Sequence, residues 1–335
     1  MVDFYDRWLS LSDEWKQQSA KARKFIHEEE LIWLRTKQDF RAALLCSRDN
    51  GFLTSGDIML GEIPPKWNTG KHYHGEEAIY ITKGKGCTVI DGKRYDWEEG
   101  SCLFIPFGVV HQHFNLGDDT ARYLSVMAVA LEMFCGVAKV FQFEDAAETH
   151  LHAFDEVPIA ESDIHPEFGR LIMRAKDAPI VESGEMNELW SKETDEYSQT
   201  LAKEMRTTGG KAHRSKMVRL MRWKDSGFKA REIEITAVLH DKAGAHTGKH
   251  AHMEAVLYCL DGEGYSVVDN ERIEWKKGTL FQIAGPQTPH QHFTTGKVES
   301  RHIRVHYGVR SKFFQPIANR VWPYRYYEFG EHGNK

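Results

Sequence analysis

The sequence predicts a mainly β protein with two similar β-barrel or sandwich domains, a helical N-terminal segment and a mixed, partly helical linker. Three observations support this fold class. The chain has 335 residues, which suits two domains of about 100–200 residues each. A segment near residue 70 recurs near residue 248. Each copy contains short strand-like runs separated by turn residues. We expect an N-terminal helical segment at 1–48, a first barrel domain at 49–144, an inter-domain segment at 145–222 and a second barrel domain at 223–335.

The N-terminal segment is predicted to be helical over residues 11–45. It contains no proline or glycine, and Ser10 or Ser12 would cap its first turn. Its apolar residues recur at helical spacing, as shown by Leu11, Trp15, Ala22, Ile26 and Trp33.

The repeat is the strongest internal signal. The stretch from Thr69 to His74 reads TGKHYH and returns as TGKHAH from Thr247 to His252, an offset of 178 residues. Further along, the HQHF stretch from His111 returns from His290 at an offset of 179. So many matches in one register indicate one structural unit present twice.

Within each unit the pattern is typical of antiparallel strands. Residues 78–82 and 87–90 are rich in β-branched and aromatic side chains, and Asp91-Gly92 is a hairpin turn before the run 93–97. In the second copy Asp269-Asn270 occupies the same position. Between the units, residues 145–222 are polar and loop-rich, with a helical stretch predicted around Thr194–Arg206 and a break at Gly209-Gly210.

Composition excludes several functional classes. The net charge is −5, so nothing in the global balance favours nucleic acid or an anionic membrane as partner. No apolar run approaches the roughly 20 residues of a membrane span, and the N-terminus does not resemble a secretory signal. The five cysteines include no Cys-x-x-Cys pair, which favours a reducing cytoplasm over a disulfide framework.

The eighteen histidines are explained by a duplicated metal site. Side chains two residues apart share a face of a strand, so the first group would be His72, His74 and Glu76, completed by His111. The second group would be His250, His252, Glu254 and His290. A single His-x-His pair could equally lie on the protein surface, but two matched groups favour metal ligands. Imidazole suits Fe(II), Cu, Ni(II) and Zn(II), and a carboxylate extends the choice to Mn(II).

Around the first group the sequence resembles the cupin signatures. Gly100, Pro106, Gly108, His111 and Asn115 match the second signature at the usual spacing. The first signature places its glutamate nearer to Glu77, but only Glu76 is repeated, as Glu254. We therefore predict Glu76 as ligand, and a bulge would bring Glu77 in instead. The second copy departs from the signature at Ala284, Pro286 and Thr294, so the first site is expected to be the better formed.

The resemblance covers about 50–140 and 228–315, and it implies a bicupin, with two β-barrel or jelly-roll domains. In size, N-terminal segment and the VHQHFN stretch ending at Asn115, the chain resembles the gentisate and salicylate 1,2-dioxygenase group. That resemblance implies Fe(II) held by three histidines, here His72, His74 and His111, and cleavage of a hydroxylated aromatic substrate with O₂. A ligand set with a fourth, carboxylate member is more similar to that of oxalate decarboxylases and quercetinases.

Three further residues are candidates for roles beside the metal. His113 follows the ligand His111 by two residues and is a candidate base; a supporting or surface role is the alternative. In the second copy His302, Arg304 and His306 alternate with apolar residues. If they face the barrel interior, Arg304 and His306 would bind substrate, with Arg304 pairing a carboxylate. The sequence slightly favours the opposite orientation, a solvated outer face.

Three functions remain open from the sequence. The first is an Fe(II) dioxygenase acting on a small oxygenated, aromatic molecule and O₂. The second is a Mn-dependent decarboxylase or oxidase of a small carboxylate, and the third is a metal-stabilised binding bicupin without turnover. Exposed strand edges and the aromatic run 322–327 favour a homo-oligomer. We expect no nucleic-acid or membrane partner.

Overall fold

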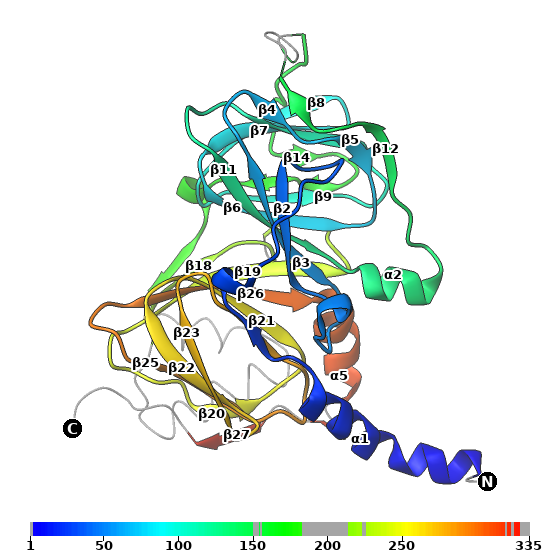
Figure 1. Cartoon of the computed structure of the whole chain (residues 1–335), viewed down its shortest axis with the longest axis vertical. Coiled ribbons are helices and arrows are strands. Elements are labelled where there is room, and N and C mark those ends of the chain that lie inside the picture. Colours follow the sequence, from blue (N-terminus) through cyan, green and yellow to red (C-terminus); the bar gives the residue numbers. More distant parts are fainter. Residues whose placement is uncertain are drawn as a thin grey trace.

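The computed structural model describes residues 3–149, 154, 156–182, 214–222, 226–318, 320–322 and 325–328. Figure 1 shows two β-rich bodies stacked along the long axis, with the N-terminal helix projecting from the lower one. The helix predicted at Thr194–Arg206 and the break at Gly209-Gly210 lie outside the described residues. In the described part of the chain, no helix is long and apolar enough to cross a membrane.

The first barrel consists of two facing antiparallel sheets. One sheet has the order β16 (Ile172–Met173), β9 (Cys102–Ile105), β6 (Glu77–Lys83), β11 (Ala121–Met127), β3 (Asp57–Ile63) and β2 (Arg41–Cys46). The other has the order β12 (Phe141–Glu144), β5 (Lys71–Tyr73), β10 (His111–Asn115), β4 (Trp67–Asn68) and β13 (Ala147–Glu148), with β7 (Lys85–Ile90) on β10 and β8 (Lys93–Glu98) on β7.

The second barrel repeats this arrangement. Its larger sheet has the order β1 (Phe25–Ile26), β24 (Leu280–Ile283), β21 (Ala255–Asp261), β26 (Ser300–Tyr307), β19 (Ile233–Asp241), β18 (Arg214–Arg219) and β17 (Ile180–Glu182). The facing sheet has the order β23 (Glu271–Lys276), β22 (Glu263–Val268), β25 (His290–Thr294), β20 (Lys249–Ala251) and β27 (Arg325–Glu328). The mainly β, two-barrel prediction is confirmed.

The remaining elements are short. Helix α1 spans Phe4–Lys21, α2 spans Val129–Cys135 and α5 spans Gln315–Ala318, preceded by the π-helical η4 (Val309–Phe314). Three 3₁₀ turns are η1 (Glu28–Glu30), η2 (Arg48–Asn50) and η3 (Ala175–Asp177), and a small hairpin joins β14 (Ile164–His165) to β15 (Gly169–Arg170).

The hairpin turns form as predicted. Asp91 and Gly92 both have positive φ, 49° and 71°, and Asp269 and Asn270 have 50° and 68°. Positive φ at both central residues is the geometry that twists two strands into a tight hairpin. These turns pair β7 with β8 and β22 with β23.

The helical prediction for residues 11–45 is wrong beyond Lys21. Helix α1 begins earlier, capped by Asp3, whose carboxylate accepts the amides of Tyr5 and Asp6, so neither Ser10 nor Ser12 is the cap. Residues 25–26 form β1, which pairs with β24 of the second barrel, and 41–46 form β2. Ile26 is 3% exposed, because adding a strand to a sheet buries it more fully than a lone helix would.

The two barrels share one hydrophobic core where the six-stranded sheet of the first meets the seven-stranded sheet of the second. The cluster includes Leu124 and Val126 from β11 of the first barrel and Ile303 and Val305 from β26 of the second. Because side chains alternate along a strand, the residues between these point away from the joint. They therefore face the interior of their own barrel.

Candidate metal centre

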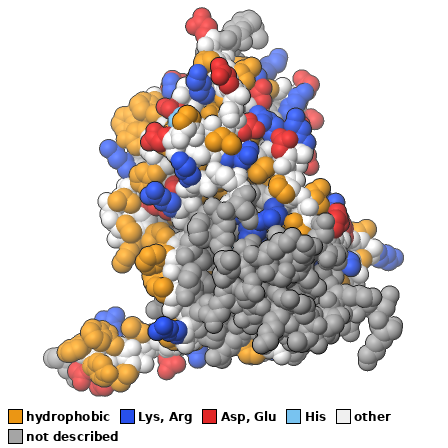
Figure 2. Space-filling model, turned by 180° about the vertical axis from the view of Figure 1, so that it is seen from behind, with side chains coloured by type: hydrophobic (Ala, Val, Ile, Leu, Met, Phe, Trp, Pro, Cys, Tyr) orange, Lys and Arg blue, Asp and Glu red, His pale blue; other side chains and the backbone are white. Residues whose placement is uncertain are grey.

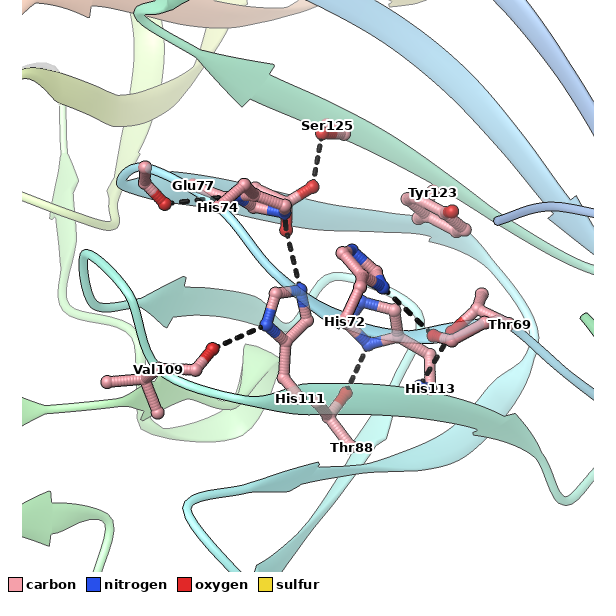
Figure 3. A network of polar contacts seen from close by, with 12 residues as sticks. Thr69, His72, His74, Glu77, Thr88, Val109, His111, His113, Tyr123 and Ser125 are labelled. Carbon is pink, nitrogen blue, oxygen red and sulfur yellow. Dashed lines mark hydrogen bonds and ion pairs between the residues drawn. The ribbon is translucent and has the colours of Figure 1, made fainter. Parts of the chain in front are cut away.

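Three histidines converge inside the first barrel, as Figure 3 shows. His72 lies on β5 and His111 on β10, and the two residues are direct partners across the antiparallel pair. His74 follows β5 in the turn before β6. The ligand atoms of the three lie within 4.8 Å of one another, and the side chains are 0%, 5% and 1% exposed.

The hydrogen bonds of these rings fix which nitrogen is available. Nδ1 of His72 donates to the Gly70 carbonyl, Nδ1 of His74 to the Gly75 carbonyl and Nδ1 of His111 to the Val109 carbonyl, each at 2.9 Å. A carbonyl only accepts, so Nδ1 carries the proton and Nε2 carries a lone pair. Among the described residues, no hydrogen-bond partner meets any of these three buried Nε2 atoms.

A carboxylate completes the first group, and it belongs to Glu77. Its Oε2 lies 3.5 Å from His74 Nε2 and 3.7 Å from His111 Nε2. The Ser125 hydroxyl donates to the other oxygen, Oε1. Burial alone would raise the pKa of Glu77, but the close contact and charge of His74, with the charge of His111, hold that pKa below its usual value. The carboxyl is therefore ionised, as a metal ligand must be.

The prediction of Glu76 as this carboxylate is wrong. Its Oε2 accepts the backbone amides of Arg231 and Glu232 at 2.7 and 2.8 Å, which places it at the joint with the second barrel. The alternation argument failed because the strand stops at Tyr73 and resumes at Glu77. The turn between them shifts the inward face by one residue.

Burial keeps two of the three imidazoles neutral. It lowers the pKa of His111 well below the usual value, assisted by the charges of His74 and His72. The same causes, burial first and then His74, lower the pKa of His72. Burial would also lower the pKa of His74, but the adjacent Glu77 raises it instead. The neutral ring is the form that binds a metal.

His113, the candidate base, lies next to the group but is held by a chain of hydrogen bonds. Trp97 Nε1 donates to Thr88 Oγ1 at 3.0 Å, and Thr88 Oγ1 lies 2.7 Å from His113 Nδ1. The ring is 5.6 Å from that of His111 and 3% exposed. Its Nε2 has no hydrogen-bond partner in the described part of the chain. This position suits a residue that supports the site.

The second barrel contains an equivalent triad. His250 on β20 faces His290 on β25, and the ligand atoms of His250, His252 and His290 lie within 4.8 Å of one another. Each Nδ1 again bonds a backbone carbonyl, that of Gly248, Met253 or Thr288. His250 and His252 are partly exposed, unlike their counterparts in the first barrel.

The two sites differ in charge. Ala255 stands where the first barrel has Glu77, so this triad has no matching carboxylate. The predicted ligand Glu254 lies elsewhere, like Glu76. Its Oε2 accepts the Ser55 hydroxyl at 2.7 Å, and its Oε1 accepts the Gln282 amide at 2.6 Å. The repeated glutamates therefore link the barrels, and their repetition reflects the joint rather than the metal site.

The alternating set on β26 faces the barrel interior, so the prediction of a solvated face is wrong. Ile303 and Val305 fill the shared core, which turns His302, Arg304 and His306 inward. The His306 ring lies 6.4 Å from that of His252, and Arg304 Nε donates to Thr236 Oγ1 at 2.8 Å. Arg304 shares the inward face of β26 with His306, and burial, then the Arg304 charge, lower the pKa of His252 to about 4.

Sequence reasoning missed several residues that shape these sites. Ser125 supports Glu77, and Thr236 orients Arg304. Tyr123 lies beside His113, with ring centroids 5.7 Å apart, and donates to the buried Asp39. The available signal was the copy-to-copy difference at β11 and β26, where Ser125 is replaced by Arg304.

The donors present fit a divalent first-row metal in each barrel. Three neutral imidazole nitrogens with one carboxylate, or three nitrogens alone, are typical ligand sets for such ions. The orphaned Nε2 atoms of the first triad, buried at 0–5% exposure, are otherwise costly, because buried polar atoms normally have partners.

Comparison with known proteins agrees with this geometry. Residues 59–127 match the profile of the cupin domain. Among curated proteins, a polyketide synthase protein, CurC, of Streptomyces cyaneus is 32% identical over 71 residues, which are 21% of this chain and 46% of that one. An uncharacterised protein of Methanocaldococcus jannaschii is 32% identical over 54 residues, 16% of this chain and 43% of that one. The match thus spans less than half of each curated relative.

Solved structures resemble the whole chain at low sequence identity. A salicylate 1,2-dioxygenase of Pseudoaminobacter salicylatoxidans, in adducts with gentisate, has a TM-score of 0.58 and 13% identity, covering 100% of this chain and 96% of that one. An oxalate decarboxylase variant of Bacillus subtilis has a TM-score of 0.62 and 13% identity, covering 86% and 77%. The chain is therefore a bicupin in fold, resembling the salicylate and gentisate dioxygenase group and the oxalate decarboxylases.

Proposed function

We propose that this bicupin is an Fe(II)-dependent dioxygenase that cleaves a small hydroxylated aromatic carboxylic acid with O₂, and that the second barrel holds the reacting site. One observation carries the proposal. The interior that contains the second triad also contains Arg304, on the inward face of β26, and has Ala255 in place of a carboxylate. A divalent ion and a guanidinium there leave positive charge that an anionic substrate would balance.

The residues of this site suit that substrate. The Nε2 atoms of His250, His252 and His290 would hold the metal, which when bound would supply the capacity to bind substrate oxygens and O₂. The planar fork of Arg304, oriented by Thr236, would bind the carboxylate with two hydrogen bonds. The inward-facing His306 would accept or hold the proton of the substrate hydroxyl.

The first barrel suits a different role. Its triad is closed to solvent, with exposures of 0–5%, and Glu77 already offsets part of the charge of a divalent ion. Those features favour tight retention of a metal over substrate binding. We propose that His72, His74, Glu77 and His111 hold this ion, with His113 as a supporting residue.

A second candidate is a Mn-dependent decarboxylase or oxidase of a small carboxylate. Glu77 favours it, because a three-histidine, one-carboxylate set also suits Mn(II). In that case the reaction would take place in the first barrel. Release of CO₂ without stoichiometric O₂ consumption would identify this activity.

The test combines metal analysis with O₂ uptake. The protein is loaded with Fe(II) or Mn(II), and O₂ consumption is followed with hydroxybenzoates, catechols and hydroquinones. Uptake dependent on Fe(II) and on a substrate carboxylate supports the proposal. Arg304→Gln should raise KM by roughly 10–100-fold, the loss of one or two charge-assisted hydrogen bonds, and leave metal content unchanged. Arg272→Gln, an exposed residue, is the control. Binding of these acids without turnover would instead support a non-catalytic bicupin.

We also propose a cytoplasmic homo-oligomer. All five cysteines are free thiols, which suits a reducing compartment. Helix α1 projects from the body (Figure 1) and is seen at the lower left of Figure 2 with hydrophobic side chains on its surface. Phe4, Trp8 and Leu9 are 70%, 60% and 68% exposed. Such a cluster is unusual on a monomer and would be covered by a second copy.

A further inference from the structure

A pocket at the joint between the barrels lies outside both histidine groups. Its volume is about 960 Å³, within the range of sites that bind small molecules. The wall is mainly apolar and aromatic, with Trp15 from α1, Phe134 from α2, Phe314 from η4 and Trp322. Its polar residues include Asp57 and Glu232.

Two carboxyl groups meet at this pocket, and one of them, Glu232, lines it. Glu232 is partly exposed, whereas Glu132 on α2 is 3% exposed and interacts with Glu232. Glu132 Oε1 and Glu232 Oε2 are both buried without a hydrogen bond from a donor group of any other described residue. Only a proton shared by the two carboxyl groups, or a donor from outside the chain, can satisfy both oxygens.

The surroundings of the pair are acidic. Burial, then the charges of Glu132 and Glu76, raise the pKa of Glu232 to about 8, and Asp57 adds a further repulsion on Glu132. Among the described residues that line the pocket, the basic side chain is Arg48, whose Nε donates to the Thr54 carbonyl. The acidic groups therefore exceed the basic ones on this wall.

The surrounding backbone also holds the Glu132 and Glu232 carboxyl groups in place. A Cβ on Gly75 would lie 1.7 Å from Glu132 Oε1, so only glycine leaves room for this carboxyl. On the other side, the Glu232 amide donates to Glu76 Oε2 at 2.8 Å, and the Gly308 amide donates to the Glu232 carbonyl. The backbone thus fixes Glu232 at the pocket wall and Glu132 against Gly75, next to Glu232.

We propose that this pocket binds a small organic ammonium ion with an aromatic or aliphatic body. An N–H donor of the ammonium group would bind the Glu232 carboxyl in place of the proton that it shares with Glu132, and Asp57 would add attraction. The aromatic wall would cover the apolar body and contribute cation–π contacts. This site is separate from the two histidine triads and does not depend on the reaction proposed for them.

The experiment compares two ligands of nearly equal shape. Tryptamine and tryptophol share an indole and a two-carbon arm, but only tryptamine carries an ammonium group. Binding to the full-length, metal-loaded chain is measured by calorimetry. We expect one tryptamine per chain and a Kd roughly tenfold or more below that of tryptophol, as charge-assisted hydrogen bonds predict.

Variants locate the site. Glu232→Gln should weaken tryptamine by roughly tenfold or more, to the level of tryptophol, and leave tryptophol binding and metal content unchanged. Ala130→Trp, which fills the pocket from α2, should abolish binding of both ligands and serves if Glu232→Gln does not fold. The exposed Glu274→Gln is the control. Equal affinity for the two ligands, no saturable tryptamine binding, or unchanged binding by Glu232→Gln and Ala130→Trp would overturn the proposal.

Discussion

The neighbouring residues Glu76 and Glu77 should have separable effects on stability and on metal binding. Glu76 Oε2 accepts two backbone amides of the second barrel at 2.7 and 2.8 Å. Glu77 Oε2 lies 3.5 and 3.7 Å from two histidine Nε2 atoms. One carboxylate therefore joins the barrels, and the other faces the proposed metal.

The size of each effect follows from these contacts. A hydrogen bond to a charged group contributes about 1.5–3 kcal/mol, and a neutral acceptor gives roughly half of that. Glu76→Gln keeps an acceptor oxygen but loses the charge, so it should lower the free energy of unfolding by about 2–3 kcal/mol. Glu77→Gln should lower metal affinity in the first barrel by at least the roughly 10–100-fold typical of residues that only support a ligand.

The assay measures both quantities for both variants. Urea unfolding in the presence of a chelator reports the stability of the metal-free chain, and competitive metal titration reports affinity. We expect Glu76→Gln to lower only the stability of the chain and Glu77→Gln to lower mainly its metal affinity. Loss of first-barrel metal in Glu76→Gln with full retention in Glu77→Gln would refute the assignment of Glu77.

Three further changes test other parts of the structure. Gly75→Ala places a Cβ 1.7 Å from Glu132 Oε1 and should reduce the free energy of unfolding by about 1–3 kcal/mol; urea midpoints measure this. Burial raises the pKa of Asp39 to about 7, so its contribution to stability falls as pH rises from about 4 to 7. Asp39→Asn should therefore gain about 2 kcal/mol relative to wild type between pH 5 and pH 7. Trp8→Glu with Leu9→Glu should convert the oligomer to a monomer in light scattering.

Each of these expectations has a contradicting result. A Gly75→Ala chain as stable as wild type would mean that Glu132 is not held against the turn; Glu132→Ala in the same chain should restore stability. A pH-independent difference between Asp39→Asn and wild type would contradict the buried, protonated Asp39. A wild-type monomer would remove the oligomer proposal, and an unchanged mass in the Trp8 and Leu9 variant would exclude α1 from the interface.

Much of the site could be predicted from the sequence because it is repeated. The offsets of 178 and 179 residues brought His72, His74 and His111 into register with His250, His252 and His290, and both triads converge in the structure. Repetition of histidine was informative since both copies use it for one purpose.

The repeated glutamates led to a wrong prediction, because they are repeated for a reason other than metal binding. Glu76 and Glu254 are repeated because both bind across the joint of the two barrels, which is itself a feature of a duplicated chain. The inward residue at that point, Glu77, has no counterpart in the second barrel, where Ala255 stands. A search for matched residues could not identify it.

Tertiary packing decided what local patterns left open. Phe25 and Ile26 have apolar spacing compatible with a helix, but the free edge of β24 is available to them, and strand pairing outweighs weak helix propensity. Ile303 and Val305 point to the joint because another sheet covers them. A single barrel with solvent on that face would have favoured the opposite orientation.

The central claim is that each barrel holds one divalent metal through its histidine triad. Metal analysis of the chain after loading with Fe(II) in the absence of oxygen tests it most directly. We predict two ions per chain in wild type, and one in each of two variants, His72→Ala with His111→Ala and His250→Ala with His290→Ala. Fewer than two ions bound to wild type, or no loss in either variant, would contradict this assignment.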